Sequence, residues 1–256
     1  KNVALGLTLF VNLSILCFFK YSGMLVSMIN ALCDPLGMGA IPVPNIVLPI
    51  GISFYTFQAM SYPIDLYLDR SRPALSFVHF SAYVSLFPQL IAGPIVRYEE
   101  IDDQLRNLQE RPNYRQFNIG LQFFVLGLAK KLLIADLIAE RCDLLFLSPD
   151  SAGFCVSWLM LLGYTLQIYF DFSAYSDMAV GLGYFLGFRF PQNFDSPYKA
   201  SNISDFWKRW HMTLSAWLRD YLYVSLGGSR GGNRATLRNL SVTMFLGGLW
   251  HGAAWT

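Results

Sequence analysis

Long apolar stretches separated by short polar segments follow one another along this chain. The first, Val3 to Phe19, contains no charged residue and has roughly the minimum length of a membrane-spanning helix, about 17–25 residues. Similar uncharged stretches run from Ile46 to Tyr62 and from Phe154 to Phe170, and Leu240 to Thr256 forms the last apolar run. The pattern therefore predicts several helices that cross a bilayer.

Other apolar segments are too short or too polar to span a membrane. In residues 73–96, Pro88 and Gly93 interrupt the apolar pattern, which is typical of re-entrant or kinked segments whose freed backbone groups are satisfied by protein. Residues 97–116 mix acidic and basic side chains and predict a loop with a short surface helix. Residues 178–188 predict a short separate helix after the polar string DFSAYSD.

The segment from Asn202 to Leu226 has the clearest helical periodicity. Seven of the nine positions on one face are apolar or aromatic, and His211 is the one imidazole among them. The nine positions are Trp207, Trp210, His211, Leu214, Trp217, Leu218, Tyr221, Leu222 and Ser225. The charged residues that fall largely outside this face are Lys208, Arg209, Arg219 and Asp220. We therefore expect one basic amphipathic helix with a histidine on its hydrophobic face.

The composition supports a membrane protein. Hydrophobic residues make up 54% of the 256 residues and charged residues only 14%, whereas soluble chains average about 25% charged. The mean hydropathy is +0.38. The sequence contains neither a long basic block nor an arginine-rich arm, so nucleic acid is not an expected partner. Four scattered cysteines and three histidines without H-x-x-x-H spacing predict neither a disulfide framework nor a metal site.

No internal repeat or low-complexity linker divides the sequence, so we expect one membrane-embedded domain over residues 1–256. The chain begins in one apolar run without a starting Met and ends in another, which we interpret as a fragment truncated at both ends. Eight of the nineteen Lys and Arg residues lie between Arg189 and Arg238. The positive-inside rule therefore favours the cytoplasmic side for that region.

His251 is the strongest candidate for chemistry. It follows Trp250 in an apolar run, and the glycines and alanines around it let another backbone approach closely or leave room for a slender substrate. An ionisable residue inside a membrane segment suggests a function. The alternative is a histidine that hydrogen-bonds a neighbouring helix and serves packing alone.

For His211 the packing interpretation is the stronger one when the residue is taken alone, although Lys208 and Arg209 beside it could hold an anionic or thioester-bearing group. Asp171 and Asp177 could form a carboxylate pair for acid–base work. Their spacing of six residues does not place them on one helical face, so capping or turn formation is at least as good an interpretation.

The glycine-rich string LGGSRGGN does not match the phosphate-binding pattern G-x-x-x-x-G-K-[ST]. With Arg230, Arg234 and Arg238 around it, its backbone amides could still cradle a phosphate, but a flexible interfacial loop is the favoured interpretation. No G-x-S-x-G motif indicates a serine hydrolase. A transporter built from broken helices is the serious alternative to an enzyme.

Several strings resemble the membrane-bound O-acyltransferase family, in the bacterial branch typified by the alginate O-acetyltransferase membrane subunit. They are QIYFDFSAYSDMAVGLGYFLGFRFPQNFDSPYKASNISDFWKRWHMTLSAWLRDYLYVSLGGSR, GGLWHGAAWT, LPIGISFYTFQAMSY and FPQLIAGPIVRY. The resemblance covers nearly the whole chain and implies that an N-terminal part and a larger C-terminal part are missing. Two positions depart from the family pattern, because Ala174 stands where a glycine is expected and GSRGG replaces G-N-R-K/R-G. Both departures concern local loop geometry only.

The resemblance implies an all-α, polytopic fold, a ring of tilted helices around a thinned centre through which donor and acceptor meet from opposite faces. His251 matches the histidine that the family regards as catalytic, and His211 matches the second histidine, in the R-W-H motif. The implied donor is a cytoplasmic acyl thioester, acetyl-CoA, used as a substrate with no bound cofactor. The implied acceptor is an exported polysaccharide such as alginate, reached through a periplasmic partner transferase, and the implied location is the bacterial inner membrane.

In this hypothesis His251 is the general base or a transient acyl carrier, and His211 orients the thioester carbonyl or relays the proton. We expect the donor phosphates near Lys208, Arg209 and Arg230. The further donor-binding candidates are Trp207, Trp210, Arg219, Asp220 and Trp250. One alternative is D-alanyl transfer from a carrier protein to teichoic acid, whose branch shares R-W-H but usually lacks L-G-G-x-R. The other alternative is a transporter or export channel without chemistry.

Overall fold

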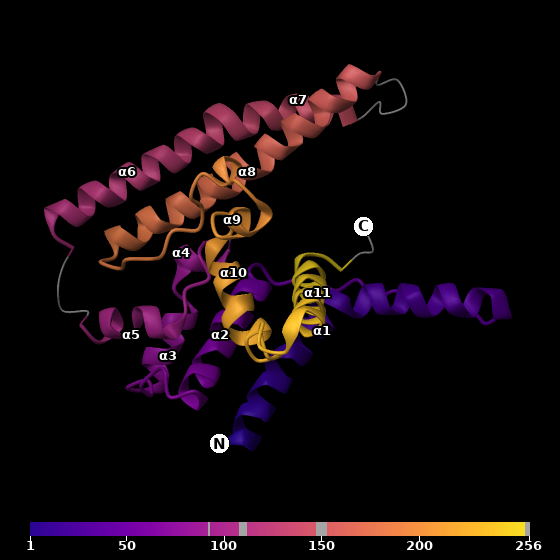
Figure 1. Ribbon diagram of the computed structural model, residues 1–256, viewed down its shortest axis with the longest axis horizontal. Helices are drawn as coiled ribbons and strands as arrows, with labels where there is room; N and C mark the ends of the chain where they lie inside the picture. Colours follow the sequence, from indigo (N-terminus) through magenta and orange to yellow (C-terminus); the bar gives the residue numbers. More distant parts are fainter. Residues whose placement is uncertain (92, 108–111, 147–152, 254–256) are drawn as a thin grey trace. The chain divides into compact units, whose positions relative to one another are not determined.

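The computed structural model describes residues 1–91, 93–107, 112–146 and 153–253. Every regular element within these ranges is a helix, and no β-strand occurs among them (Figure 1). This confirms the predicted all-α fold class for the described part of the chain.

The chain divides into two compact units. Unit 1 comprises Lys1–Ser85, Arg97–Asp102 and Leu214–Thr256. Unit 2 comprises Leu86–Val96 and Asp103–Thr213. The sequence shows no linker at these boundaries because two of them fall inside helices.

The helices of unit 1 are α1 (Asn2–Cys33), η1 (Asp34–Leu36), α2 (Ile52–Tyr67), α3 (Phe77–Val84), the π-helical turns of η5 (Leu218–Tyr223) and α11 (Gly232–His251). Those of unit 2 are α4 (Phe87–Leu90), α6 (Tyr114–Lys130), the π-helical turn η2 (Lys131–Ala135), α7 (Asp136–Phe146), α8 (Phe154–Phe185), η4 (Pro197–Lys199) and α9 (Ile203–Trp207). The two helices that cross a boundary are α5 (Tyr98–Arg106) and α10 (Met212–Trp217).

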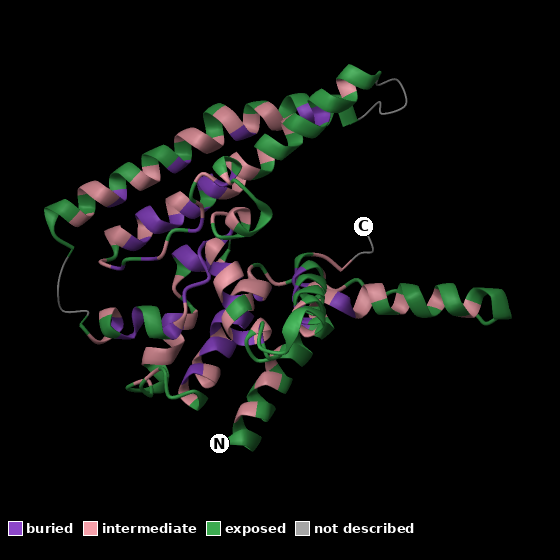
Figure 2. Ribbon diagram, viewed as in Figure 1, coloured by how far each residue is buried: buried purple, intermediate pink, exposed green. Residues whose placement is uncertain are grey.

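Helix α1 is longer than the predicted stretch Val3 to Phe19, because it continues through Lys20 to Cys33. The Lys20 ammonium does not end the helix, since it donates hydrogen bonds to the Trp250 carbonyl oxygen and to Ser53 Oγ, the latter at 3.2 Å. Most of α1 is exposed (Figure 2). Among the described residues, only this segment, residues 2–36, has the length and the composition of a membrane-crossing helix.

The predicted short helix 178–188 is wrong, because α8 runs without a break from Phe154 to Phe185. Asp171 and Asp177 are therefore neither caps nor turn residues but lie in the middle of a helix. Lys131 Nζ lies 2.6 Å from Asp171 Oδ1 and Lys130 Nζ lies 2.5 Å from Asp177 Oδ2. These ion pairs supply the counter-charges that allow the helix to continue through both carboxylates.

Unit 2 is built on close packing of α6 against α8, which run side by side (Figure 1). A Cβ added at Gly120 would lie 2.9 Å from the carbonyl oxygen of Gly181, and one added at Gly181 would lie 2.7 Å from that of Gly120. Contacts below 3.0 Å are too short for a carbon atom. The two backbones therefore approach each other through paired glycines, as membrane helices commonly do.

The prediction of a single helix from Asn202 to Leu226 is also wrong. The chain leaves α9 after Trp207, passes His211 with a φ of +43°, and enters α10 at Met212. The break is caused by a distant segment, because the Met212 N–H donates to the Asn193 carbonyl at 2.9 Å and the Asp195 N–H donates to the Arg209 carbonyl at 2.9 Å. These bonds replace the helical hydrogen bonds that an uninterrupted helix would make.

The remaining predicted segments hold in part. The interrupted region 73–96 forms only the short helices α3 and α4, as Pro88 and Gly93 indicated. The charged region 97–116 contains α5 as its short helix, with residues 108–111 outside the described residues. The last apolar run belongs to α11, which begins earlier than predicted, at Gly232, and residues 254–256 lie outside the described residues.

Candidate functional site

His211 occupies a buried polar site within unit 2. Only 2% of its surface is exposed, and its Nδ1 lies 3.0 Å from Oδ1 of Asn193, which is equally buried. The Thr213 backbone N–H and Thr213 Oγ1 reach the same amide oxygen at 3.3 and 3.0 Å. Thr213 Oγ1 in turn accepts a hydrogen bond from the Ile95 N–H at 3.0 Å. Three segments of sequence, around Ile95, Asn193 and His211–Thr213, thus converge to hold one imidazole.

Aromatic rings surround this polar group. The Phe172 ring meets the imidazole edge to face, with 4.7 Å between ring centroids. Next to His211 in sequence, Trp210 packs against Phe194 at 5.2 Å and stacks on Phe206 at 5.6 Å. Phe172 thus covers one side of the imidazole, and His211 itself is buried, so its hydrogen bonds are made in a medium of low polarity, where they are stronger.

The basic residues that precede His211 lie nearer the surface. Lys208 is exposed, and Trp207 has 39% of its surface exposed, with its ring 5.5 Å from that of Phe206. Arg209 Nε lies 3.0 Å from Asp205 Oδ1, which forms a partly buried ion pair. Arg209 NH1 lies 3.4 Å from Asp195 Oδ2. Of the two predicted phosphate-binding cations in this segment, Lys208 is therefore the more accessible one.

Unit 1 contains a stack of three aromatic rings beside His251. The Phe57 ring lies parallel to Trp217 at 3.9 Å and faces Trp250 at 5.1 Å. The indole N–H of Trp217 donates to the Phe57 carbonyl at 3.1 Å, and the indole N–H of Trp250 donates to the Ser53 carbonyl at 3.3 Å. Helix α2 therefore contacts both the end of α10, through Trp217, and the end of α11, through Trp250.

His251 is the last residue of α11, and its side chain is exposed. Its ring meets Trp250 edge to face at 4.8 Å between centroids. The turn that carries it is tied to α1, because Tyr21 Oη donates to the Leu249 carbonyl at 2.6 Å and Lys20 donates to the Trp250 carbonyl. The predicted catalytic histidine thus sits on a helix end that two side chains of α1 hold in place.

Arg219 and Asp220, both predicted to bind the donor, form a charged cluster in unit 1. Asp220 Oδ2 accepts from Arg97 NH1 at 3.0 Å, and Asp220 Oδ1 accepts from Arg219 Nε at 2.7 Å. Arg97 also lies within ion-pair distance of Glu99 and Glu100. Asp220 therefore links a largely buried cation, Arg97, to an exposed one, Arg219.

A buried carboxyl group lies next to this cluster. The Tyr221 hydroxyl donates to both oxygens of Asp65, at 2.7 and 2.8 Å, and Asp65 has no exposed surface. Burial raises the pKa of Asp65 to about 6, and the Tyr221 hydrogen bond lowers it in part. Asp65 lies beyond the uncharged part of α2. No local sequence pattern indicates that Asp65 pairs with Tyr221, since 156 positions separate the two.

The glycine-rich string after η5 forms turns with positive φ at Gly227, Gly228 and Gly232. Asn239 of α11 fixes these turns, because its Nδ2 donates to the Gly228 carbonyl at 2.9 Å. Arg230 is exposed on the same turns. Helix α11 therefore holds the glycine-rich turns through the Asn239–Gly228 hydrogen bond, and Arg230, the predicted phosphate-binding residue, is exposed to solvent.

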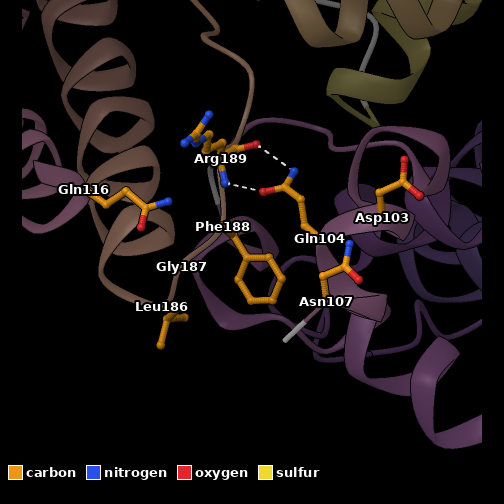
Figure 3. Close-up of a pocket in the computed structure, with 8 residues that line it drawn as sticks. All are labelled: Asp103, Gln104, Asn107, Gln116, Leu186, Gly187, Phe188 and Arg189. Carbon is orange, nitrogen blue, oxygen red and sulfur yellow. Dashed lines mark hydrogen bonds between the residues drawn. The ribbon is translucent and has the colours of Figure 1, made fainter. Parts of the chain in front are cut away.

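A polar cavity of about 420 Å³ lies in unit 2 (Figure 3). None of its lining residues is a predicted site residue; they are Asp103, Gln104, Asn107, Gln116, Leu186, Gly187, Phe188 and Arg189. The Gln104 amide accepts from the Arg189 N–H at 2.7 Å and donates to its carbonyl at 3.3 Å. This pair of bonds anchors the loop after α8, which continues into Asn193.

Two buried amides were not singled out from the sequence. Asn193 supports His211 as described above. The Gln58 side chain on α2 is fully buried, and within the described residues neither of its amide atoms has a hydrogen-bond partner. Both are uncharged residues without motif spacing, so no pattern of titratable side chains could have revealed them.

Across the described ranges, no group of three or more His, Cys, Asp or Glu side chains is placed to hold a metal ion.

Comparison with known families identifies the family of this helical chain. Residues 46–256 match the model of the membrane-bound O-acyltransferase family. The chain belongs to this family. The resemblance inferred from the R-W-H and L-W-H strings is thereby confirmed.

The relatives are enzymes named for transfer to polymers. The chain is 48% identical over 253 residues to the protein named "Probable alginate O-acetylase AlgI" of Azotobacter vinelandii, covering 98% of this chain and 50% of that one. It is 40% identical over 281 residues to the peptidoglycan O-acetyltransferase of Helicobacter pylori, covering 100% and 53%. A more distant relative is the teichoic acid D-alanyltransferase of Bacillus subtilis, at 28% identity over 221 residues, covering 83% and 56%. The chain spans about half the length of the curated relatives it matches.

Proposed function

We propose that this chain is the core of a membrane O-acetyltransferase that moves an acetyl group from a cytoplasmic thioester, acetyl-CoA, towards hydroxyl groups of an exported polysaccharide such as alginate. The identity of 48% to an alginate O-acetylase and of 40% to a peptidoglycan O-acetyltransferase supports acetyl as the transferred group. The protein would be a multi-pass component of the bacterial inner membrane, with several helices besides α1 embedded in the bilayer.

The observation that carries the proposal is the setting of His211. A packing histidine needs only a hydrogen-bond partner, whereas this imidazole is held at a left-handed backbone position, φ +43°, which is uncommon for residues other than glycine and costs free energy. Three hydrogen-bond donors converge on the amide that supports it. Strain of this kind is commonly retained where a side chain must point in one direction.

The proposed reaction needs a base and a polarised carbonyl. The acceptor hydroxyl gives its proton to an imidazole nitrogen, and its oxygen attacks the thioester carbonyl carbon. The carbon–sulfur bond then breaks, and the thiolate of CoA takes up a proton, so that acetyl ester and free CoA are the products. Neutral imidazole, with an ordinary pKa of about 6.5, accepts and releases protons near neutral pH, and general-base catalysis contributes typically ~10²–10⁴-fold.

In this proposal His251 is the general base or carries the acetyl group transiently, and His211 orients the thioester carbonyl or relays the proton. The exposed side chain of His251 at the end of α11 suits a group that must meet a substrate. The buried, oriented ring of His211 suits a group that acts on a substrate already in place.

Donor binding is assigned to the accessible cations. Lys208 and Arg230 are exposed and would receive the phosphates of CoA, while Arg209, which is already paired with Asp205, would assist at longer range. Trp207, with its partly exposed ring, would lie along the donor. Trp210 of unit 2 and Trp250 of unit 1 are the further residues proposed to contact the donor. Arg219 is exposed and would add to the positive surface, with Asp220 holding it in position. A periplasmic transferase would complete delivery to the polysaccharide.

D-alanyl transfer onto teichoic acid is the second candidate, because a relative with that name is 28% identical to this chain. The lower identity and the L-G-G-x-R string at Leu226 to Arg230 favour acetyl transfer. The two functions differ in their donor. A D-alanyl transferase takes its acyl group from a carrier protein and would not consume acetyl-CoA.

Chemistry and transport are separated by vesicles that contain the full-length protein and receive acetyl-CoA labelled with one isotope in the acetyl group and another in CoA. We expect free labelled CoA on the donor side and labelled acetyl ester on an added acceptor. Intact acetyl-CoA inside the vesicles would indicate transport instead. Failure to consume acetyl-CoA, together with transfer from a D-alanyl carrier protein, would indicate the second candidate.

A further inference from the structure

The side chain that decides which nitrogen of His211 can accept a proton is Asn193. Its amide oxygen and amide nitrogen are distinguishable by hydrogen-bond chemistry. The Thr213 backbone N–H lies 3.3 Å from the atom assigned as Oδ1, and a backbone N–H can only donate. The atom that it meets must therefore be the carbonyl oxygen, which fixes the orientation of the whole amide.

The orientation of the amide determines the tautomer of the ring. His211 Nδ1 lies 3.0 Å from that same oxygen, and a carbonyl oxygen can only accept. Nδ1 must therefore carry the hydrogen. In a neutral imidazole the other nitrogen, Nε2, then carries the lone pair and is the proton acceptor.

The amide itself has little freedom to turn. The backbone carbonyl of Asn193 accepts from the Met212 N–H at 2.9 Å, while its side-chain oxygen lies 3.0 Å from His211 Nδ1. Asn193 is therefore held at both its main chain and its side chain. Thr213 Oγ1 donates to Oδ1 at 3.0 Å while accepting from the Ile95 N–H, which fixes the direction of the hydroxyl. A rotation of the amide would place its N–H₂ group against these donors.

We propose that Asn193 is a positioning residue that holds His211 as the Nδ1–H tautomer and so presents Nε2 as a proton acceptor, which assigns His211 the proton-relay role beside the general base His251. The catalytic part of this inference rests on the proposed acetyl transfer, but the tautomer does not. The charged residues nearest to Asn193 and His211 in sequence are Asp195 and Arg209, whose Oδ2 and NH1 atoms lie 3.4 Å apart as an ion pair. In the wild type the ring is therefore oriented by a neutral group.

Two substitutions separate orientation from packing. Asn193→Asp keeps an acceptor for Nδ1–H and so keeps the tautomer, but its negative charge favours the imidazolium form. The acid limb of the pH–rate profile should then shift to higher pH, with activity recovered at alkaline pH. Asn193→Leu removes the acceptor for Nδ1–H, so the tautomer of His211 is no longer fixed and Nε2 is not reliably the proton acceptor. We expect kcat to fall on the order of 10²-fold with little change in KM for acetyl-CoA.

The matched control is Asn113→Asp. Asn113 is an exposed N-cap of α6 in the same unit, and aspartate caps helices as well as asparagine does. Asn113→Asp is the same substitution as Asn193→Asp, at a residue far from His211 in the sequence. We expect its pH–rate profile to match that of the wild type.

The direct test is nitrogen NMR of the full-length protein labelled with ¹⁵N-histidine, with the His211 signals assigned by their loss in His211→Gly. We expect a protonated Nδ1 and a lone-pair Nε2 at alkaline pH in the wild type and in Asn193→Asp, and a changed pattern in Asn193→Leu. An Nε2–H tautomer in the wild type would overturn the inference. If Asn193→Leu does not fold, an unshifted pH profile in Asn193→Asp overturns it as well. A correct tautomer in a protein that transfers no acetyl group would refute the proposed function alone.

Discussion

The Phe57 ring lies parallel to the Trp217 ring, 3.9 Å away between centroids and with 9° between the planes. Phe57 also faces Trp250, so one side chain of α2 connects the end of α10 to the end of α11. Trp217 has only 7% of its surface exposed. Unit 1 therefore places the helix end that carries His251 by aromatic stacking in its core.

Replacing this indole should destabilise the fold. We expect Trp217→Ala to lower the free energy of unfolding by about 3–5 kcal/mol, because it removes a buried aromatic ring and leaves a cavity. Trp217→Phe should lose much less, since it keeps a stacked ring and gives up mainly the hydrogen bond to the Phe57 carbonyl. Thermal unfolding of the purified proteins in detergent measures the difference. Equal effects of the two substitutions would contradict the role of the stack.

The close approach of α6 and α8 predicts that even one added methyl group is not tolerated. We expect Gly120→Ala to destabilise the protein by about 1–3 kcal/mol, because the new Cβ would lie 2.9 Å from the Gly181 carbonyl oxygen and 2.9 Å from Tyr184 Cβ. Gly6→Ala in α1 is the control, since nothing lies within 4 Å of its added Cβ. An unfolding temperature of Gly120→Ala that equals that of the control would show that the helices can separate without loss.

Asp65 predicts a pH-dependent stability. Its pKa is about 6 in the folded protein against an ordinary value near 3.8. Between these two values the Asp65 carboxyl keeps a proton in the folded chain that it has released in the unfolded chain. The contribution of Asp65 to the free energy of unfolding is therefore greatest below pH 4 and is lost as pH rises through 6. The loss amounts to about 3 kcal/mol at most, at 1.36 kcal/mol per pKa unit.

The substitution Asp65→Asn removes this titration and keeps an acceptor for Tyr221. The unfolding temperature of the wild type, taken relative to Asp65→Asn, should therefore decline from pH 4 to pH 6.5 and stay level above it. Asp34→Asn changes an exposed carboxylate of η1 and serves as the control. A difference between wild type and Asp65→Asn that does not change with pH would refute the buried, protonated state.

The local pattern predicted the helices well where short-range periodicity decides the structure. The stripe on residues 202–226 correctly placed Leu214, Trp217 and Tyr221 in the core. It failed at His211, because the backbone of Asn193 and Asp195 takes over hydrogen bonds that a helix would make. No periodicity within the segment contains that information.

The continuity of α8 was missed for a related reason. Asp171 and Asp177 look like a helix end when only their neighbours are considered, and their counter-charges stand 40 and 47 positions earlier, at Lys131 and Lys130. The candidate histidines were found because imidazoles are rare in apolar runs. Asn193 was missed because an uncharged amide becomes informative only when its three donors are seen around it.

The central claim is that His251 and His211 perform acetyl transfer, and it is tested most directly by the acetyl ester formed per unit of full-length protein from acetyl-CoA. We expect His251→Ala to abolish transfer while the amount of protein in the membrane stays normal. His211→Gly, which accepts the positive φ of that position without strain but leaves a cavity where the buried imidazole was, should reduce transfer severely per unit of folded protein. Substantial acetylation by His251→Ala would contradict the account.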